Sequence, residues 1–212
     1  MKLFTFVIIA LMLSGIAMAA EVPTSEGDKA MVFSFQGLSE LDVDGPHPWG
    51  VGMRYYIADY TAIRATLIFG NCSYTEEMEG YEDDYEETYS LYGVEAVYEK
   101  HLESPCASVV PYWGIGGGFE MWTDETVTPY DYRDGYTETE SGTAFYFFGA
   151  LGFEWAFTDC LTLGGEYQAG FWTGSGETEY EYPGGDTETC CEWSNTCMGF
   201  DDSSELYLAV YW

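Results

Sequence analysis

The feature that most constrains this chain is the repeated alternation of apolar residues with small or polar ones. In the segment Val109–Trp122, Ile115 and Phe119 share one face while Gly116 and Gly118 share the other. Helical periodicity is weak, so the sequence predicts an all-β fold. The eight predicted strands are Ala30–Leu38, Trp49–Ala58, Thr61–Gly70, Leu91–Glu99, Val109–Trp122, Phe145–Trp155, Leu161–Trp172 and Glu205–Trp212.

The connections between these strands alternate in length. The short ones are Asp59–Tyr60, Lys100–Ser108 and Ala156–Cys160. The long ones are rich in acidic residues and span Ser39–Pro48, Asn71–Ser90, Thr123–Gly142 and Thr173–Ser204. Short periplasmic turns and longer outer loops are typical of transmembrane barrels. We therefore predict an eight-stranded antiparallel up-and-down transmembrane β-barrel with short periplasmic turns and long acidic extracellular loops.

The charge balance and the aromatic content exclude two classes of protein. Six Lys and Arg residues stand against 37 Asp and Glu residues, which gives a formal net charge of −31. Nucleic-acid binding needs clustered basic residues, so no nucleic-acid partner is expected. Phe, Trp and Tyr make up 18% of the chain, and disordered chains are poor in aromatic residues.

The N-terminal segment has the pattern of a secretory signal peptide. Lys2 precedes the apolar run Leu3–Leu13, and the small residues Ala17 and Ala19 follow. We expect residues 1–20 to be cleaved and residues 21–212 to form the barrel. The longest later apolar stretch, Phe145–Phe153, is too short for a helix that spans a bilayer.

The alternation by itself does not say which face meets lipid. Most predicted strands have about nine or more residues, the length that crosses a bilayer when tilted. The less apolar face is dominated by Gly, Ala, Ser, Thr and Tyr, while Trp and Tyr gather near strand ends, such as Trp49 and Trp155. We therefore expect the apolar face to contact the lipid of the outer membrane, and the opposite face to line a narrow lumen.

Isolated charges on the lumen side predict an interior ionic network. An eight-stranded barrel is only wide enough for side chains to fill it, and a buried charge has to be paired. We expect Arg54, Glu95 and Glu166 near mid-height and Arg64 and Glu154 nearer the periplasmic end. Two arginines do not neutralise every carboxylate, so at least one glutamate is expected to hold its proton. A proton or ion path is the alternative to a structural plug.

The chain resembles the small eight-stranded outer-membrane proteins of the OmpA/OmpX-domain and opacity-protein type. The resemblance is carried by the strand Pro111–Gly118 and by the alternating terminal strand Leu206–Trp212. It implies an integral outer-membrane barrel and recognition of the last strand by the outer-membrane assembly machinery. Phe is usual at the last position of that family, so Trp212 is a departure.

Six cysteines in an exported chain predict disulfides. Cys106 and Cys160 fall in neighbouring periplasmic turns and form the natural pair, because a disulfide does not cross the bilayer. The outer cysteines are Cys72, Cys190, Cys191 and Cys197. Excluding the strained vicinal pair leaves two pairings, each of which ties the second long loop to the last one. A Cys-based metal site is disfavoured because paired CxxC spacing is missing.

The acidic outer loops predict attraction of divalent cations or cationic surface partners. The calcium candidates are weak, because they lack EF-hand spacing. They are Glu82, Asp83, Asp84 and Glu86. No cofactor and no dedicated metal site are expected.

No catalytic residue can be assigned from the sequence. The two histidines, His47 and His101, fall in connections at opposite ends of the predicted barrel. The preferred hypothesis is thus a non-enzymatic outer-membrane barrel with a structural or surface-interaction role. A secreted soluble barrel that carries an apolar ligand is the first alternative. An outer-membrane lipid-modifying enzyme is the second.

Overall fold

The computed structural model describes residues 20–36, 48–76, 85–128, 136–182, 186–199 and 204–212. Most of these residues lie in strands, and no helix among them is long and apolar enough to span a membrane. The strands are β1 (Lys29–Gln36), β2 (Trp49–Ala58), β3 (Thr61–Glu76), β4 (Tyr85–His101), β5 (Val109–Thr128), β6 (Tyr136–Thr158), β7 (Leu161–Glu181), β8 (Thr187–Gly199) and β9 (Ser204–Tyr211).

Eight of these strands close into an antiparallel ring. β1 to β7 follow one another, β7 pairs with β9, and β9 pairs with β1. The pairing of β6 with β7 completes the ring, while β8 lies outside it and pairs only with β7. Closure removes the open sheet edges that would otherwise leave backbone groups unpaired in lipid. The predicted eight-stranded antiparallel barrel is confirmed.

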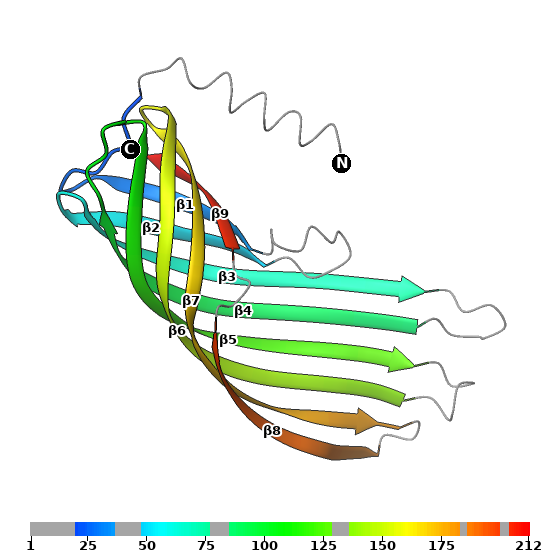
Figure 1. Ribbon diagram of the computed structural model, residues 1–212. Helices are drawn as coiled ribbons and strands as arrows, with labels where there is room; N and C mark the ends of the chain where they lie inside the picture. Colours follow the sequence, from blue (N-terminus) through cyan, green and yellow to red (C-terminus); the bar gives the residue numbers. More distant parts are fainter. Residues whose placement is uncertain (1–19, 37–47, 77–84, 129–135, 183–185, 200–203) are drawn as a thin grey trace.

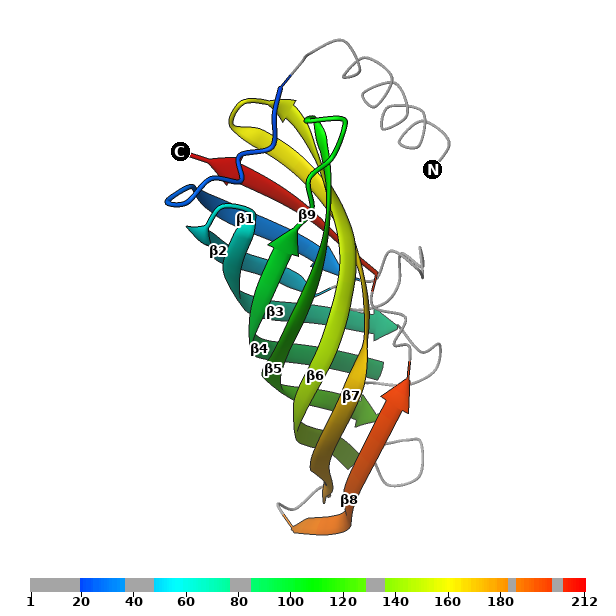
Figure 2. The ribbon, with the colours of Figure 1, turned by 60° about the vertical axis from the view of Figure 1, so that its left-hand side comes forward.

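The long strands continue far beyond the closed part of the barrel. β3 to β7 have 16 to 23 residues each, whereas β1 and β9 have 8. Their far halves form an open sheet with β8 along one edge and β3 along the other (Figures 1 and 2). We call this part the outer sheet; it comprises Asn71–Glu76, Tyr85–Ser90, Thr123–Thr128, Tyr136–Gly142, Thr173–Glu181 and Thr187–Gly199.

The sequence-based prediction of long loops is wrong over most of these segments. Thr123–Gly142 was expected to be a loop, yet residues 123–128 and 136–142 are strand. β8 likewise lies inside the predicted connection Thr173–Ser204. Thr and Tyr favour extended backbone, but a sheet with water on both faces needs no apolar alternation, so the periodicity signal is missing.

The exposure of side chains fixes which face meets the membrane. Phe147 is 65% exposed and Leu151 is 69% exposed, whereas Arg54 is completely buried. A soluble carrier with the same strands would bury the first two and expose the third. The apolar face therefore points outward, as predicted, and the inside-out carrier arrangement is wrong.

The first described residues pack at the end of the barrel where the short turns lie. Ala20 and Val22 form a buried cluster with Val110 of β5 and Ala156 of β6. The amide of Val22 also donates a hydrogen bond to the carbonyl of Ala107 (3.1 Å). Residues 1–19 lie outside the described part, so the signal peptide stays a prediction.

Candidate functional site

Two arginines from neighbouring strands form the centre of the lumen. Arg54 of β2 and Arg64 of β3 are direct cross-strand partners, and both side chains are fully buried. The sequence-based placement of Arg64 closer to the periplasm than Arg54 is wrong. The reason is an irregularity in the pairing of β2 with β3. The register shifts by one residue between Tyr56 and Ala58, just before the turn, and this shift sets Arg54 opposite Arg64.

Arg54 bridges β2 to the strands opposite. Its Nε lies 2.7 Å from Oε2 of Glu99, and its Nη1 lies 2.7 Å from Oε2 of Glu154. Both carboxylates have an exposed fraction of zero. Glu154 also accepts hydrogen bonds from the hydroxyls of Thr162 and Tyr211. These partners satisfy a carboxylate that burial would otherwise destabilise strongly.

Arg64 pairs with other carboxylates of the lumen and shares one of them, Glu99, with Arg54. Its Nη2 lies 3.0 Å from Oε1 of Glu166 and 3.6 Å from Oε1 of Glu95, and its Nε lies 3.2 Å from Oε1 of Glu99. Glu205 of β9 lies at the edge of this group, 4.0 Å from the same Nη2. The ion pairs thus connect β2 and β3 with β4, β6, β7 and β9 across the lumen.

The five predicted lumen residues lie together in this network. Arg54 does not pair with Glu95 or Glu166, the two glutamates expected at its height, and its carboxylate partners are Glu99 and Glu154. Glu99 and Glu205 were not among the predicted lumen residues. Glu99 shares the face of Glu95 by the period of two, so its signal was present at the strand end. Glu205 lies two residues before the buried Tyr207 and on the same face of β9, so its signal was also present.

Tyrosines pack around the arginines. The Tyr207 ring lies 4.9 Å from the guanidinium carbon of Arg54 and 5.5 Å from that of Arg64. The hydroxyl of Tyr112 donates a 2.6 Å hydrogen bond to Oε2 of Glu166. Gly164 faces the Tyr207 ring so closely that any side chain would overlap it. Ion pairs, aromatic rings and small residues together fill this level of the barrel.

His101 belongs to the same buried layer. Its Nε2 lies 3.2 Å from Oε2 of Glu99 and 3.3 Å from the hydroxyl of Tyr56, and its ring stacks on Tyr112. The nearby hydroxyl of Ser104 accepts a hydrogen bond from the amide of Cys106 (3.2 Å). The contacts of His101 are therefore those of a packed interior residue. His47 lies outside the described residues.

The outer sheet presents charge of one sign on the same strands. Several of its carboxylates that the sequence placed in loops are carried by paired strands: Glu76, Glu86, Glu87, Glu177, Glu179, Glu181, Glu188 and Glu192. Burial, followed by the charges of Glu87 and Glu140, raises the pKa of Asp124. Burial and the charges of Glu120 and Asp124 raise the pKa of Tyr89 to about 12. The potential of this region is therefore strongly negative.

Of the calcium candidates, Glu86 lies on β4 and the other three lie outside the described residues. In the described ranges, no group of three or more His, Cys, Asp or Glu side chains is arranged to hold a metal ion.

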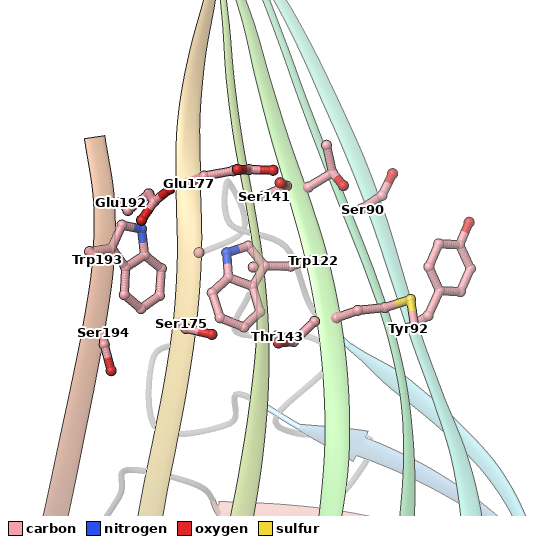
Figure 3. Close-up of a pocket in the computed structure, with 14 residues that line it drawn as sticks. Ser90, Tyr92, Trp122, Ser141, Thr143, Ser175, Glu177, Glu192, Trp193 and Ser194 are labelled. Atoms are coloured by element: carbon pink, nitrogen blue, oxygen red, sulfur yellow. The ribbon is translucent and has the colours of Figure 1, made fainter. Parts of the chain in front are cut away.

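A row of tryptophans and glycines crosses the outer sheet near its junction with the barrel. Trp122, Gly142, Gly176 and Trp193 are successive cross-strand partners on β5 to β8. The indoles lie over the two glycines and stack at 5.8 Å between ring centroids. A surface pocket of about 880 Å³ follows this row, and Figure 3 shows the two indoles between the strands. Its polar lining side chains are Ser90, Thr123, Ser141, Thr143, Ser175, Ser194, Glu177 and Glu192, beside Tyr92.

All six cysteines are free thiols in the structure. Cys106 and Cys160 lie in short turns, where their sulfurs contact Ser108 (3.1 Å) and Thr158 (3.5 Å) of the same turns. The Cys106–Cys160 disulfide stays a prediction.

Comparison with known proteins gives the family. A family model described as outer membrane protein beta-barrel domain matches residues 6–188. This chain is a member of that family. The match supports localisation in the bacterial outer membrane, and the barrel family accounts for the closed ring and the outward apolar face.

Among the solved structures, one that shares this architecture illustrates the fold. It is a major outer membrane protein from Thermus thermophilus, with a TM-score of 0.55 and 10% sequence identity. The alignment covers 88% of this chain and 100% of that one. At this identity the likeness shows the fold alone. The search of curated proteins found no match.

Proposed function

We propose that this member of the barrel family is a non-enzymatic outer-membrane protein with a closed lumen, and that its outer sheet engages cations or cationic surface partners. The observation that carries the proposal is the contrast between the charges inside the barrel and those on the outer sheet, two regions that β3 to β7 connect. Inside the barrel, Arg54 and Arg64 are fully buried and paired with carboxylates from the facing strands. The segments that make up the outer sheet carry many carboxylates and no Lys, Arg or His.

The closed lumen follows from the size of the network. An eight-stranded barrel encloses about the volume that side chains fill. Two guanidiniums, five carboxyls and the rings of Tyr207 and Tyr112 occupy one level of it. A solute that passed through would have to break several buried ion pairs, each of which is costly to separate.

Conductance across a planar lipid bilayer tests this part of the proposal. The purified barrel is expected to give no steady ion current, and a double variant, Arg54→Ala with Arg64→Ala, is expected to give current if it still folds. The exposed substitution Glu177→Gln is the control and leaves the bilayer silent. A steady current through the native barrel would contradict the closed lumen.

Binding of a short oligolysine peptide tests the role of the outer sheet. The affinity is expected to fall steeply between low salt and physiological salt, because the Debye length shortens from about 30 Å to about 8 Å. A variant with Glu86, Glu87, Glu138 and Glu140 changed to Gln is expected to bind at least several-fold more weakly. A parallel titration with Ca²⁺ separates divalent cations from cationic partners. Affinity that does not respond to the four substitutions would contradict the proposal.

The terminal strand is proposed as the segment that the assembly machinery recognises. Trp212 follows β9 and is 64% exposed, at the barrel end where the short turns lie. Replacing Trp212 by Ala is expected to lower the amount of folded barrel in the outer membrane, and Trp212→Phe is expected to restore it. Equal amounts of folded barrel in all three forms would contradict this role.

A further inference from the structure

The two adjacent cysteines of β8 lie in an irregular part of the outer sheet. In the pairing of β7 with β8, Thr178 opposes Cys191 and Glu179 opposes Thr189. Cys190 is therefore an extra residue without a direct partner, which defines a β-bulge. Successive side chains of a regular strand point to opposite faces, and a bulge re-aims one of them.

The bulge brings the two thiols together. The Sγ atoms of Cys190 and Cys191 lie 2.9 Å apart, and both residues are exposed. The sequence-based prediction excluded this vicinal pair as strained and tied Cys72 to the last loop, but the other outer cysteines lie away from the bulge. Cys72 lies on β3, which is separated from β8 by the four strands β4 to β7 along the outer sheet. Cys197 lies on β8 opposite Trp172, several residues beyond the bulge.

We propose that Cys190 and Cys191 form a redox-active vicinal dithiol, which closes to an intramolecular disulfide by exchange with a low-molecular-weight disulfide and reopens in the presence of thiols. The thiolate of one cysteine attacks the small disulfide and releases one small thiol. The second cysteine then attacks the mixed disulfide and releases the other. The protein loses two protons and two electrons, and the small disulfide gains them as two thiols.

The adjacency of the two cysteines predicts a disulfide that is easily reduced rather than a permanent structural cross-link. The Cα atoms of adjacent residues are about 3.8 Å apart, below the usual range of about 4.4–6.8 Å for disulfide-bonded cysteines. Strained and exposed disulfides are the ones most easily reduced. The closed loop also contains no intervening residue, so the bond restricts the unfolded chain very little.

The reactivity of the pair depends on pH in a defined direction. The hydrogen bond with Cys191, together with the charge of Glu188, raises the pKa of the Cys190 thiol. Because the thiolate is the attacking species, closure is expected to accelerate as the pH rises from neutral to mildly alkaline.

Peptide mapping of the full-length barrel in detergent tests the proposal. The reduced protein is incubated with glutathione disulfide, remaining thiols are blocked, and the peptides are identified by mass spectrometry. We expect the peptide that contains both Cys190 and Cys191 to lose the mass of two hydrogen atoms. Cys72→Ser and Cys197→Ser are expected to keep this loss, whereas Cys190→Ser and Cys191→Ser are expected to abolish it.

Phenylarsine oxide, which binds two neighbouring thiols at once, provides a second measurement on the reduced protein. In a background in which Cys106 and Cys160 are Ser, one equivalent is expected to bind, and prior oxidation or Cys190→Ser is expected to prevent it. A cross-link between Cys72 and any cysteine of β8 would overturn the proposal. So would binding of the arsenical that is unchanged in Cys190→Ser.

Discussion

The barrel interior and the outer sheet use charge in opposite ways, although the five strands β3 to β7 run through both. In the interior, the carboxylates of Glu99 and Glu154 are fully buried and lie within 2.7 Å of Arg54. On the outer sheet, Glu177 and Glu192 are direct cross-strand partners with like charge, and both are exposed to water. Like charges directly opposite each other are destabilising in a sheet.

The difference shows what solvent does to a carboxylate. Water screens Glu177 and Glu192 on the outer sheet, so their repulsion is small and the sheet can carry an excess of one sign. Inside the barrel the protein itself has to supply the partner of each carboxylate, and it does so with guanidiniums and tyrosine hydroxyls. The charges of the interior therefore determine stability, and the charges of the outer sheet determine what the surface attracts.

The largest expected effect is the loss of an interior partner. Arg54→Met leaves Glu154 buried without its guanidinium and removes one of the two guanidiniums beside Glu99. Breaking a buried ion pair in this way typically costs about 3–5 kcal/mol. Urea unfolding of the barrel in lipid, followed by tryptophan fluorescence, is expected to show a much lower midpoint. Glu177→Gln on the outer sheet is the matched change and is expected to shift stability by less than about 0.5 kcal/mol. Equal urea midpoints for the two variants would contradict the view that interior charges contribute more to stability than charges on the outer sheet.

The second prediction concerns the close packing of Gly164 against the Tyr207 ring inside the barrel. Gly164→Ala places a methyl group in the volume of the Tyr207 ring, whereas Gly149→Ala meets no atom closer than 4.0 Å. Overpacking typically costs about 1–3 kcal/mol. The first variant is therefore expected to unfold at a lower urea concentration and the second to match the native barrel. If both behave alike, the Tyr207 ring has room to move.

The third prediction uses pH on the outer sheet. Burial and neighbouring carboxylates raise the pKa of Asp124, so its ionised form is disfavoured in the folded sheet. Stability of this region is therefore expected to fall as the pH rises through the pKa of Asp124 in the unfolded chain and then in the folded one. Asp124→Asn is expected to slow amide exchange of the neighbouring strands at pH 7 by a small factor and to have no effect at pH 3. A variant that exchanges faster at pH 7 would contradict this sign.

The smallest expected effect compares thiols at the two ends of the molecule. The hydrogen bond with Ser108 lowers the pKa of the Cys106 thiol, whereas the pKa of Cys190 is raised. In the reduced protein at pH 7, iodoacetamide is expected to modify Cys106 a few-fold faster than Cys190. Ser108→Ala is expected to slow the reaction at Cys106 and to leave Cys190 unchanged. A ratio of rates that stays the same in this variant would exclude the hydrogen bond as the cause.

Much of the closed barrel could be predicted from the sequence. The predicted strand Trp49–Ala58 has the observed bounds, and the predicted starts of β3, β5 and β7 are also correct. One side of these strands lies in lipid and the other in a packed lumen, so every position carries a clear apolar or small-residue signal. The outer sheet could not be predicted in this way, because both of its faces meet water and its Thr-, Tyr- and Glu-rich segments show no apolar period.

The sequence by itself determined the all-β class, the closure in a membrane and the residue types of the interior, because each follows from the period of two along single strands. Tertiary structure alone decided which carboxylate meets which arginine and how Cys190 turns toward Cys191. The ion pairs depend on strand register and on closure of β9 against β1, and the approach of the two thiols depends on one bulge in the pairing of β8 with β7. The residue pattern within one strand does not show which residue of another strand will lie beside it in the fold.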